Sequence, residues 1–68
     1  MAGLRNRLKV LRAERGLTQA DLAKAAGVSR KTINTIENRV FVPSTVLALT
    51  LAKVMDAKVE EIFELEEE

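Results

Sequence analysis

One segment constrains the fold of this chain more than any other: the stretch from Thr18 to Glu37, which reads TQADLAKAAGVSRKTINTIE. It contains two helix starts, because Thr18 and Ser29 each carry a hydroxyl that can accept a hydrogen bond from the free N–H groups of a first helical turn. Gly27 predicts the end of the first helix, since glycine adopts left-handed backbone without steric cost. The segment therefore predicts two short helices joined by one tight turn.

Apolar residues in this segment recur at helical spacing. Leu22, Ala23 and Ala26 share one face of the first helix, while Ile33 and Ile36 form the buried stripe of the second. Asp21 stands three residues after Thr18, where its carboxylate can complete a capping box. A short helix, a glycine turn and a second helix with a polar outer face are typical of a DNA-binding helix-turn-helix, here about residues 18–37.

The rest of the chain predicts three further helices. Leu4, Leu8 and Leu11 predict a first helix that ends at Gly16, with an extended conformation as the alternative for the first few residues. Ser44 is placed to cap a fourth helix, and a short fifth helix is expected over residues 59–63. The helix-turn-helix pair is expected at about residues 19–26 and 30–38. With 68 residues, the chain is expected to form one domain, residues 1–68.

Charge is segregated along the chain, although the formal net charge is only +1. Residues 1–58 hold eleven basic side chains against four acidic ones, whereas residues 59–68 hold six glutamates and no base. The cationic body predicts attraction to a polyanion. Residues 64–68 are expected to form an acidic tail, with Glu66, Glu67 and Glu68 solvated and partly frayed.

The composition excludes several chemistries. The chain has no cysteine and no histidine, so it lacks disulfides, thiolate metal ligands and the commonest general base. Its carboxylates show no paired spacing in an apolar setting. We therefore expect no catalytic residues, no metal site, no cofactor and no enzyme activity. No apolar run approaches the length of a membrane span, so we expect a cytoplasmic protein without membrane contact.

A set of short motifs runs in ungapped order from Leu8 to Phe63: Leu8, Leu11 and Arg12, then Gly16-Leu17-Thr18-Gln19, Leu22-Ala23, Gly27-Val28-Ser29, Thr32-Ile33, Ile36-Glu37, Pro43-Ser44, Leu47-Ala48, Leu51-Ala52 and Glu61-Ile62-Phe63. In this set the chain resembles the Cro/CI (Xre) family of helix-turn-helix transcriptional regulators. The resemblance implies an all-α, five-helix, lambda-repressor-like DNA-binding domain of prokaryotic or phage type, associated with the nucleoid. In length the chain resembles the small stand-alone repressors of this family.

In some of those small repressors the chain ends form a short two-stranded antiparallel β-sheet, and the protein is a homodimer. Residues 4–8 and 63–66 are the candidates for the two strands here. The C-terminal region, with Phe63 and Leu65, is the expected dimer contact.

Base contacts are expected at the start of the second helix of the pair, because a recognition helix enters the major groove with its N-terminal residues toward the bases. Arg30 and Lys31 are the leading candidates, since their donors suit the N7 and O6 acceptors of guanine. The alternative is that both are solvated surface charges. Thr32 either faces the groove or packs against the preceding helix. The full expected set is Ser29, Arg30, Lys31, Thr32, Asn34 and Thr35.

Phosphate contacts are expected at the start of the first helix of the pair, because helix N-termini favour anions. The resemblance implies that Gln19 hydrogen-bonds a phosphate and braces a side chain of the recognition helix. It also implies that Asn38 and Arg39 touch the DNA backbone. The expected phosphate contacts are thus Thr18, Gln19, Asn38 and Arg39. For Arg12 and Glu37 the resemblance implies a partly buried ion pair with a structural role.

The chain departs from the family pattern just after Glu37, in the run Asn38-Arg39-Val40-Phe41-Val42. No glycine is available to end the helix, so Asn38 or Arg39 must adopt the left-handed conformation, and asparagine would do so at lower cost. Val40 replaces a usual lysine, which removes one phosphate contact. The resemblance implies that Phe41, at a position where the family often has an aromatic, packs on the core. Val40 and Val42 either line a protein contact or lie tucked under the loop.

These features predict a sequence-specific regulator that binds double-stranded DNA, more readily a repressor than an activator. A homodimer is expected, because two recognition helices about 34 Å apart read successive major grooves of a palindromic operator. The alternative is an antitoxin or coactivator-type protein-interaction module built on the same fold. The acidic tail and the apolar Val40–Val42 loop favour that alternative.

Overall fold

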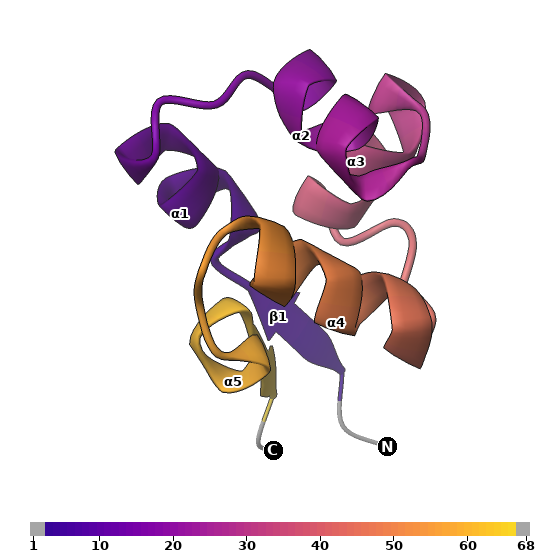
Figure 1. Cartoon of the computed structure of the whole chain (residues 1–68). Helices are drawn as coiled ribbons and strands as arrows, with labels where there is room; N and C mark the ends of the chain where they lie inside the picture. The colour runs from indigo at the N-terminus through magenta and orange to yellow at the C-terminus, as the bar shows by residue number, and fades with distance from the viewer. Residues whose placement is uncertain (1–2, 67–68) are drawn as a thin grey trace.

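The computed structural model describes residues 3–66. Five helices and two short strands follow one another along these residues (Figure 1). In chain order they are β1 (Leu4–Asn6), α1 (Leu8–Glu14), α2 (Gln19–Ala26), α3 (Arg30–Glu37), α4 (Thr45–Val54), α5 (Val59–Ile62) and β2 (Phe63–Leu65). The expected five-helix fold with a small sheet formed by the chain ends is confirmed.

One apolar core joins the helices. Each of the five helices contributes to it, and the largest side chains in it, such as Leu22, Ile33 and Leu51, are fully buried. Burying a side chain of this size contributes about 1.5–3 kcal/mol relative to leaving it exposed. The core residues are Leu8, Leu11, Leu22, Ala23, Ile33, Ile36, Leu51, Ala52, Met55 and Ile62.

The pair α2 and α3 is built by its caps. Thr18 Oγ1 accepts from the Asp21 N–H at 3.0 Å, and the Thr18 N–H donates to Asp21 Oδ2 at 2.9 Å, which completes the expected capping box. Gly27 ends α2 with φ 74°, and Ser29 Oγ accepts from the Thr32 N–H at 3.1 Å to start α3. Helix α3 ends at Glu37, one residue earlier than expected.

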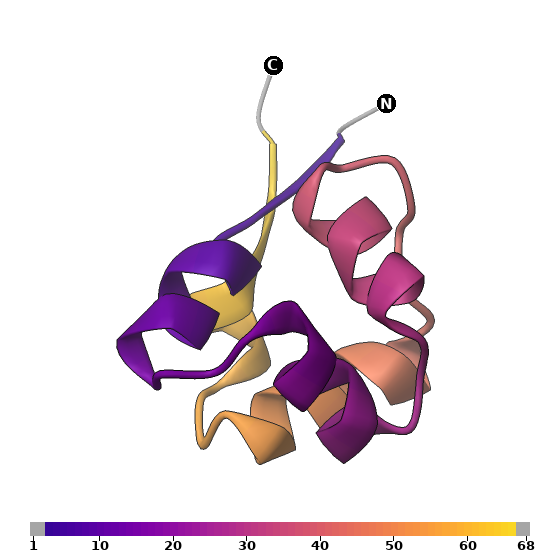
Figure 2. The ribbon, with the colours of Figure 1, turned by 90° about the horizontal axis from the view of Figure 1, so that it is seen from above.

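The chain ends form the antiparallel sheet, with Leu4 opposite Leu65, Arg5 opposite Glu64 and Asn6 opposite Phe63. It lies on the side of the molecule away from α2 (Figures 1 and 2). Of the two interpretations of the N-terminus, the extended one holds: Leu4 belongs to a strand and α1 begins only at Leu8. Asn6 causes this boundary, because its Oδ1 accepts from the Leu8 N–H at 3.1 Å while its Nδ2 donates to Ile36 O at 2.9 Å.

The C-terminal segment corrects two expectations. Phe63 opens β2 instead of closing α5. Glu66 is not frayed, since its N–H donates to Gly3 O at 2.8 Å and its carboxylate pairs with Arg39. The remaining tail residues, Glu67 and Glu68, lie outside the described residues.

Candidate nucleic-acid interface

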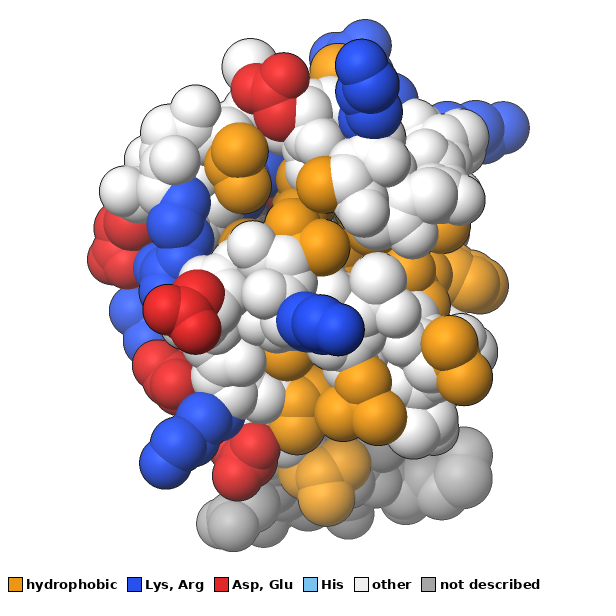
Figure 3. Space-filling model, viewed as in Figure 1, with side chains coloured by type: hydrophobic (Ala, Val, Ile, Leu, Met, Phe, Trp, Pro, Cys, Tyr) orange, Lys and Arg blue, Asp and Glu red, His pale blue; other side chains and the backbone are white. Residues whose placement is uncertain are grey.

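Helix α3 carries five of the six residues expected to contact bases, and the sixth, Ser29, is its N-cap. Ser29, Arg30, Lys31 and Asn34 are exposed, whereas Thr32 and Thr35 are half-buried. The space-filling view shows basic side chains gathered over α2 and α3, at the top of the molecule (Figure 3). The outer face of α3 is thus polar and cationic at its N-terminal end, the end that approaches bases in helix-turn-helix proteins.

Two hollows flank α3. One, of about 310 Å³, is lined by Gln19, Arg30, Lys31 and Asn34. The other, of about 340 Å³, has a mostly apolar wall lined by Ser29, Lys31, Thr32, Thr35, Val40 and Phe41. Lys31 lines both hollows, so it lies between the polar and the apolar flank of α3.

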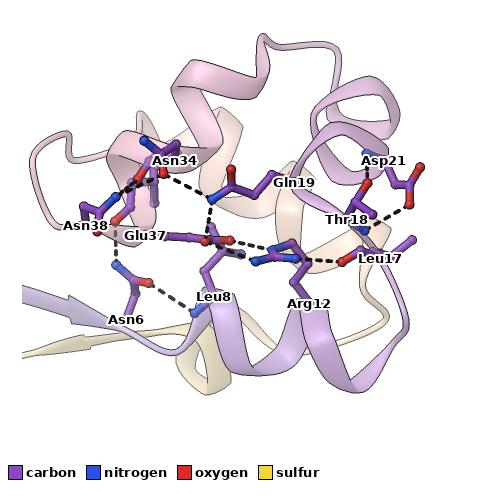
Figure 4. A network of polar contacts seen from close by, with 11 residues as sticks. Asn6, Leu8, Arg12, Leu17, Thr18, Gln19, Asp21, Asn34, Glu37 and Asn38 are labelled. Carbon is purple, nitrogen blue, oxygen red and sulfur yellow. Dashed lines mark hydrogen bonds and ion pairs between the residues drawn. The ribbon is translucent and has the colours of Figure 1, made fainter.

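A polar network holds α3 against α1 and α2 (Figure 4). Arg12 Nε donates to Glu37 Oε2 at 2.7 Å, and their side chains are only 14% and 4% exposed. Gln19 Nε2 donates to the other Glu37 oxygen at 2.9 Å, while Arg12 Nη1 donates to Leu17 O at 2.8 Å. The Glu37 carboxylate therefore accepts from two helices at once, which fixes the orientation of α3 relative to both.

Gln19 continues this network onto the outer face of α3. Its Nε2 also lies 3.2 Å from Asn34 Oδ1, and Asn38 Nδ2 donates to the same oxygen at 3.1 Å. The structure thus brings Gln19, Asn34 and Asn38 together in one chain of hydrogen bonds. Asn34 is held by its neighbours before any ligand arrives, so its side chain is oriented in advance.

Thr18 lies at the start of α2, but its polar groups serve the capping box. Two hydrogen bonds from Thr18 lower the pKa of the Asp21 carboxyl below its ordinary value. The bond from the Thr18 backbone has the larger effect and the bond from its hydroxyl the smaller. Asp21 therefore carries its negative charge beside the first turn of α2. The Thr18 hydroxyl, an expected phosphate contact, is thus already engaged with Asp21.

Arg39, not Asn38, takes the left-handed conformation after α3, with φ 62°. Asn38 is retained in the last turn because its N–H and its Nδ2 both donate to Asn34 O, at 3.1 and 2.9 Å. The left-handed geometry costs a non-glycine residue about 1–2 kcal/mol. The Arg39 guanidinium donates to Glu66 Oε2 at 2.9 Å, a contact that the sequence did not suggest.

Phe41 does not pack in the core as expected; it is 45% exposed, and Val40 and Val42 are 77% and 64% exposed. After the turn at Arg39, the N–H groups of Val40 and Phe41 both donate to Thr35 O, at 2.9 and 3.2 Å. These two bonds place the loop along the flank of α3, so Phe41 lies beside α3. Hydrophobic side chains accordingly emerge where this loop and α4 reach the surface (Figure 3).

The two residues expected at a dimer contact differ in exposure. Phe63 is half-buried and packs against the core, whereas Leu65 is 67% exposed.

In the described part of the chain, no helix combines the length and the apolar character needed to cross a bilayer. Between residues 3 and 66, no group of three or more histidine, cysteine, aspartate or glutamate side chains is placed to hold a metal ion.

Known proteins share both this sequence and this fold. A family model described as helix-turn-helix matches residues 8–62. The uncharacterized HTH-type transcriptional regulator YgzD of Bacillus subtilis is 43% identical over 96% of this chain and 98% of its own length. An uncharacterized HTH-type transcriptional regulator of Methanocaldococcus jannaschii is 48% identical with the same coverage.

A solved structure gives the same result. The restriction-modification controller protein C.AhdI from Aeromonas hydrophila superposes with a TM-score of 0.77 at 34% identity, over 81% of this chain and 83% of that one. The chain therefore belongs to the helix-turn-helix family of transcriptional regulators, as its resemblance to the Cro/CI (Xre) group predicts.

Proposed function

We propose that this protein is a sequence-specific regulator of transcription that inserts α3 into the major groove of double-stranded DNA. The observation that carries the proposal is the polar outer face of α3, exposed at Arg30 and Lys31 and held in place from behind by the Arg12–Glu37–Gln19 network. A reading helix needs both features, because side chains discriminate bases only from a fixed position.

In this proposal Arg30 and Lys31 donate to guanine O6 and N7. Asn34, oriented by its hydrogen bonds to Gln19 and Asn38, meets a second base. Ser29, Thr32 and Thr35 complete the surface next to the bases. The phosphates are contacted by Thr18, Gln19, Asn38 and Arg39, where a helix N-terminus and a cation supply favourable charge.

We further propose that the protein acts as a homodimer on a palindromic operator and as a repressor in the cytoplasm. One α3 of 8 residues reaches few base pairs, so a second copy is needed to specify a site. The exposed Leu65 supports a contact through the C-terminal region. A dimer that covers two successive grooves would also block access to the DNA between them.

Selection of bound duplexes from a random pool tests the proposal. A palindromic consensus with half-sites about one helical turn apart is expected. The variant Arg30→Ala/Lys31→Ala should lose discrimination between this consensus and random DNA, since each base contact is worth about 1–3 kcal/mol. Lys53→Ala/Lys58→Ala is the control, because it removes the same charge from exposed positions away from α3. A folded Arg30/Lys31 variant with full discrimination would overturn the assignment.

A further inference from the structure

The apolar hollow beside α3 is lined in part by Val40 and Phe41, which have no role in the contacts proposed above. Its wall is formed by Thr32 and Thr35 on α3 and by Val40 and Phe41 on the following loop. We propose that this hollow receives the C5-methyl edge of a thymine in the bound operator. Phe41 and Val40 would then be specificity-determining residues. The inference rests on the proposed function and names one base that the site reads.

The hydroxyl groups around the hollow are already hydrogen-bonded within the protein. Thr35 Oγ1 donates to Thr32 O at 2.9 Å, and the hydroxyl oxygens of Ser29 and Thr32 lie 3.0 Å apart. Apart from the Lys31 side chain, a ligand in the hollow therefore meets mainly methyl groups and an aromatic ring. An apolar group fits this lining better than a polar one, because a polar group would lose its hydration without gaining a partner.

The loop side of the hollow is held in place by the recognition helix itself. The N–H groups of Val40 and Phe41 both donate to Thr35 O, at 2.9 and 3.2 Å. Phe41 consequently moves with α3 when that helix enters the groove. An aromatic ring fixed in this way needs little ordering on binding, which favours a specific contact.

The position of the hollow identifies its occupant. Lys31 lines it and also lines the polar hollow on the other flank, so both open on the face proposed to meet DNA. In the major groove the base edges present donors, acceptors and one apolar group, the thymine methyl. Continuity with the reading face thus favours thymine over a protein partner.

Deoxyuridine tests the proposal, because it differs from thymidine only by this methyl. In the selected duplex each thymine is replaced in turn, and the dissociation constant is measured for each replacement. The wild-type protein should lose about fourfold in affinity at one thymine of each half-site, the change that corresponds to one buried methyl group. Phe41→Ala should bind both duplexes with nearly equal affinity, and Phe41→Leu should show an intermediate ratio.

Val10→Ala is the matched control, since Val10 is 48% exposed against 45% for Phe41 and lies on α1. It should retain the fourfold ratio. The proposal is overturned if no thymine shows the effect, or if Phe41→Ala stays as sensitive as the wild type. If no sequence is enriched from the random pool, that result contradicts the proposed function itself, independently of the thymine contact. Capture of a protein that needs Phe41, with no thymine effect, would assign the hollow to a partner instead.

Discussion

Glu37 is the residue on which the orientation of α3 depends. Its carboxylate is 4% exposed and accepts from Arg12 and Gln19. Glu37→Gln keeps the shape but leaves the Arg12 charge without its partner. We expect a loss of about 3 kcal/mol in the free energy of unfolding, the lower end for a broken buried pair, because Arg12 keeps its bond to Leu17 O.

Thermal unfolding measures this effect. For a domain of this size the midpoint should fall by roughly 12–24 °C. Glu60→Gln, which removes the same charge at an exposed position of α5, should leave the midpoint nearly unchanged. Equal midpoints for Glu37→Gln and the wild type would show that the pair does not stabilise the fold.

At the scale of the element, the capping box of α2 makes its stability depend on pH. Hydrogen bonds from Thr18 lower the pKa of Asp21, so the ionised carboxylate stabilises the folded state. That stabilisation is complete above the ordinary aspartate pKa of about 3.9 and is lost as the pH falls through the lower, folded-state pKa. Asp21→Asn should thus unfold more easily than the wild type at pH 7. The difference between their thermal midpoints should shrink below about pH 4, and a constant difference would contradict the linkage.

The helices were predictable from sequence because their signals are local. Thr18, Gly27 and Ser29 act within one turn of their own positions, and the bounds of α2 follow from them. The ion pair of Arg12 with Glu37 was accessible only through the family resemblance. Its partners stand 25 residues apart, so no local rule joins them.

The loop after α3 was predicted less well, because its conformation depends on contacts made elsewhere. Asparagine adopts the left-handed conformation at lower cost than arginine. Hydrogen bonds to Asn34 nevertheless keep Asn38 in the last helical turn, so Arg39 adopts the left-handed conformation instead. Phe41 follows from that turn and from two bonds to Thr35 O. The family resemblance predicted Phe41 in the core, but the family pattern does not include the turn at Arg39 that directs this side chain outward.

At the scale of the whole molecule, the sheet places the acidic C-terminal segment next to basic side chains of the rest of the domain. Arg5 pairs with Glu64 across the two strands, and Arg39 pairs with Glu66 beyond them. Both pairs are largely exposed, so each adds little to stability. Their consequence is for binding, because Arg39 is a proposed phosphate contact and a carboxylate already occupies one side of it. DNA must compete with Glu66 for this guanidinium.

Glu66→Gln should therefore tighten binding to the selected duplex severalfold at low salt and make its affinity fall more steeply with salt, since one more cation becomes free to displace counterions. Glu60→Gln changes the net charge equally but lies on α5 and makes no ion pair among residues 3–66, so it isolates the general electrostatic effect. In an Arg39→Ala background the advantage of Glu66→Gln should shrink to that of Glu60→Gln, because the competing pair no longer exists. If Glu66→Gln and Glu60→Gln tighten binding equally in the wild-type background, Glu66 does not hold Arg39 away from DNA.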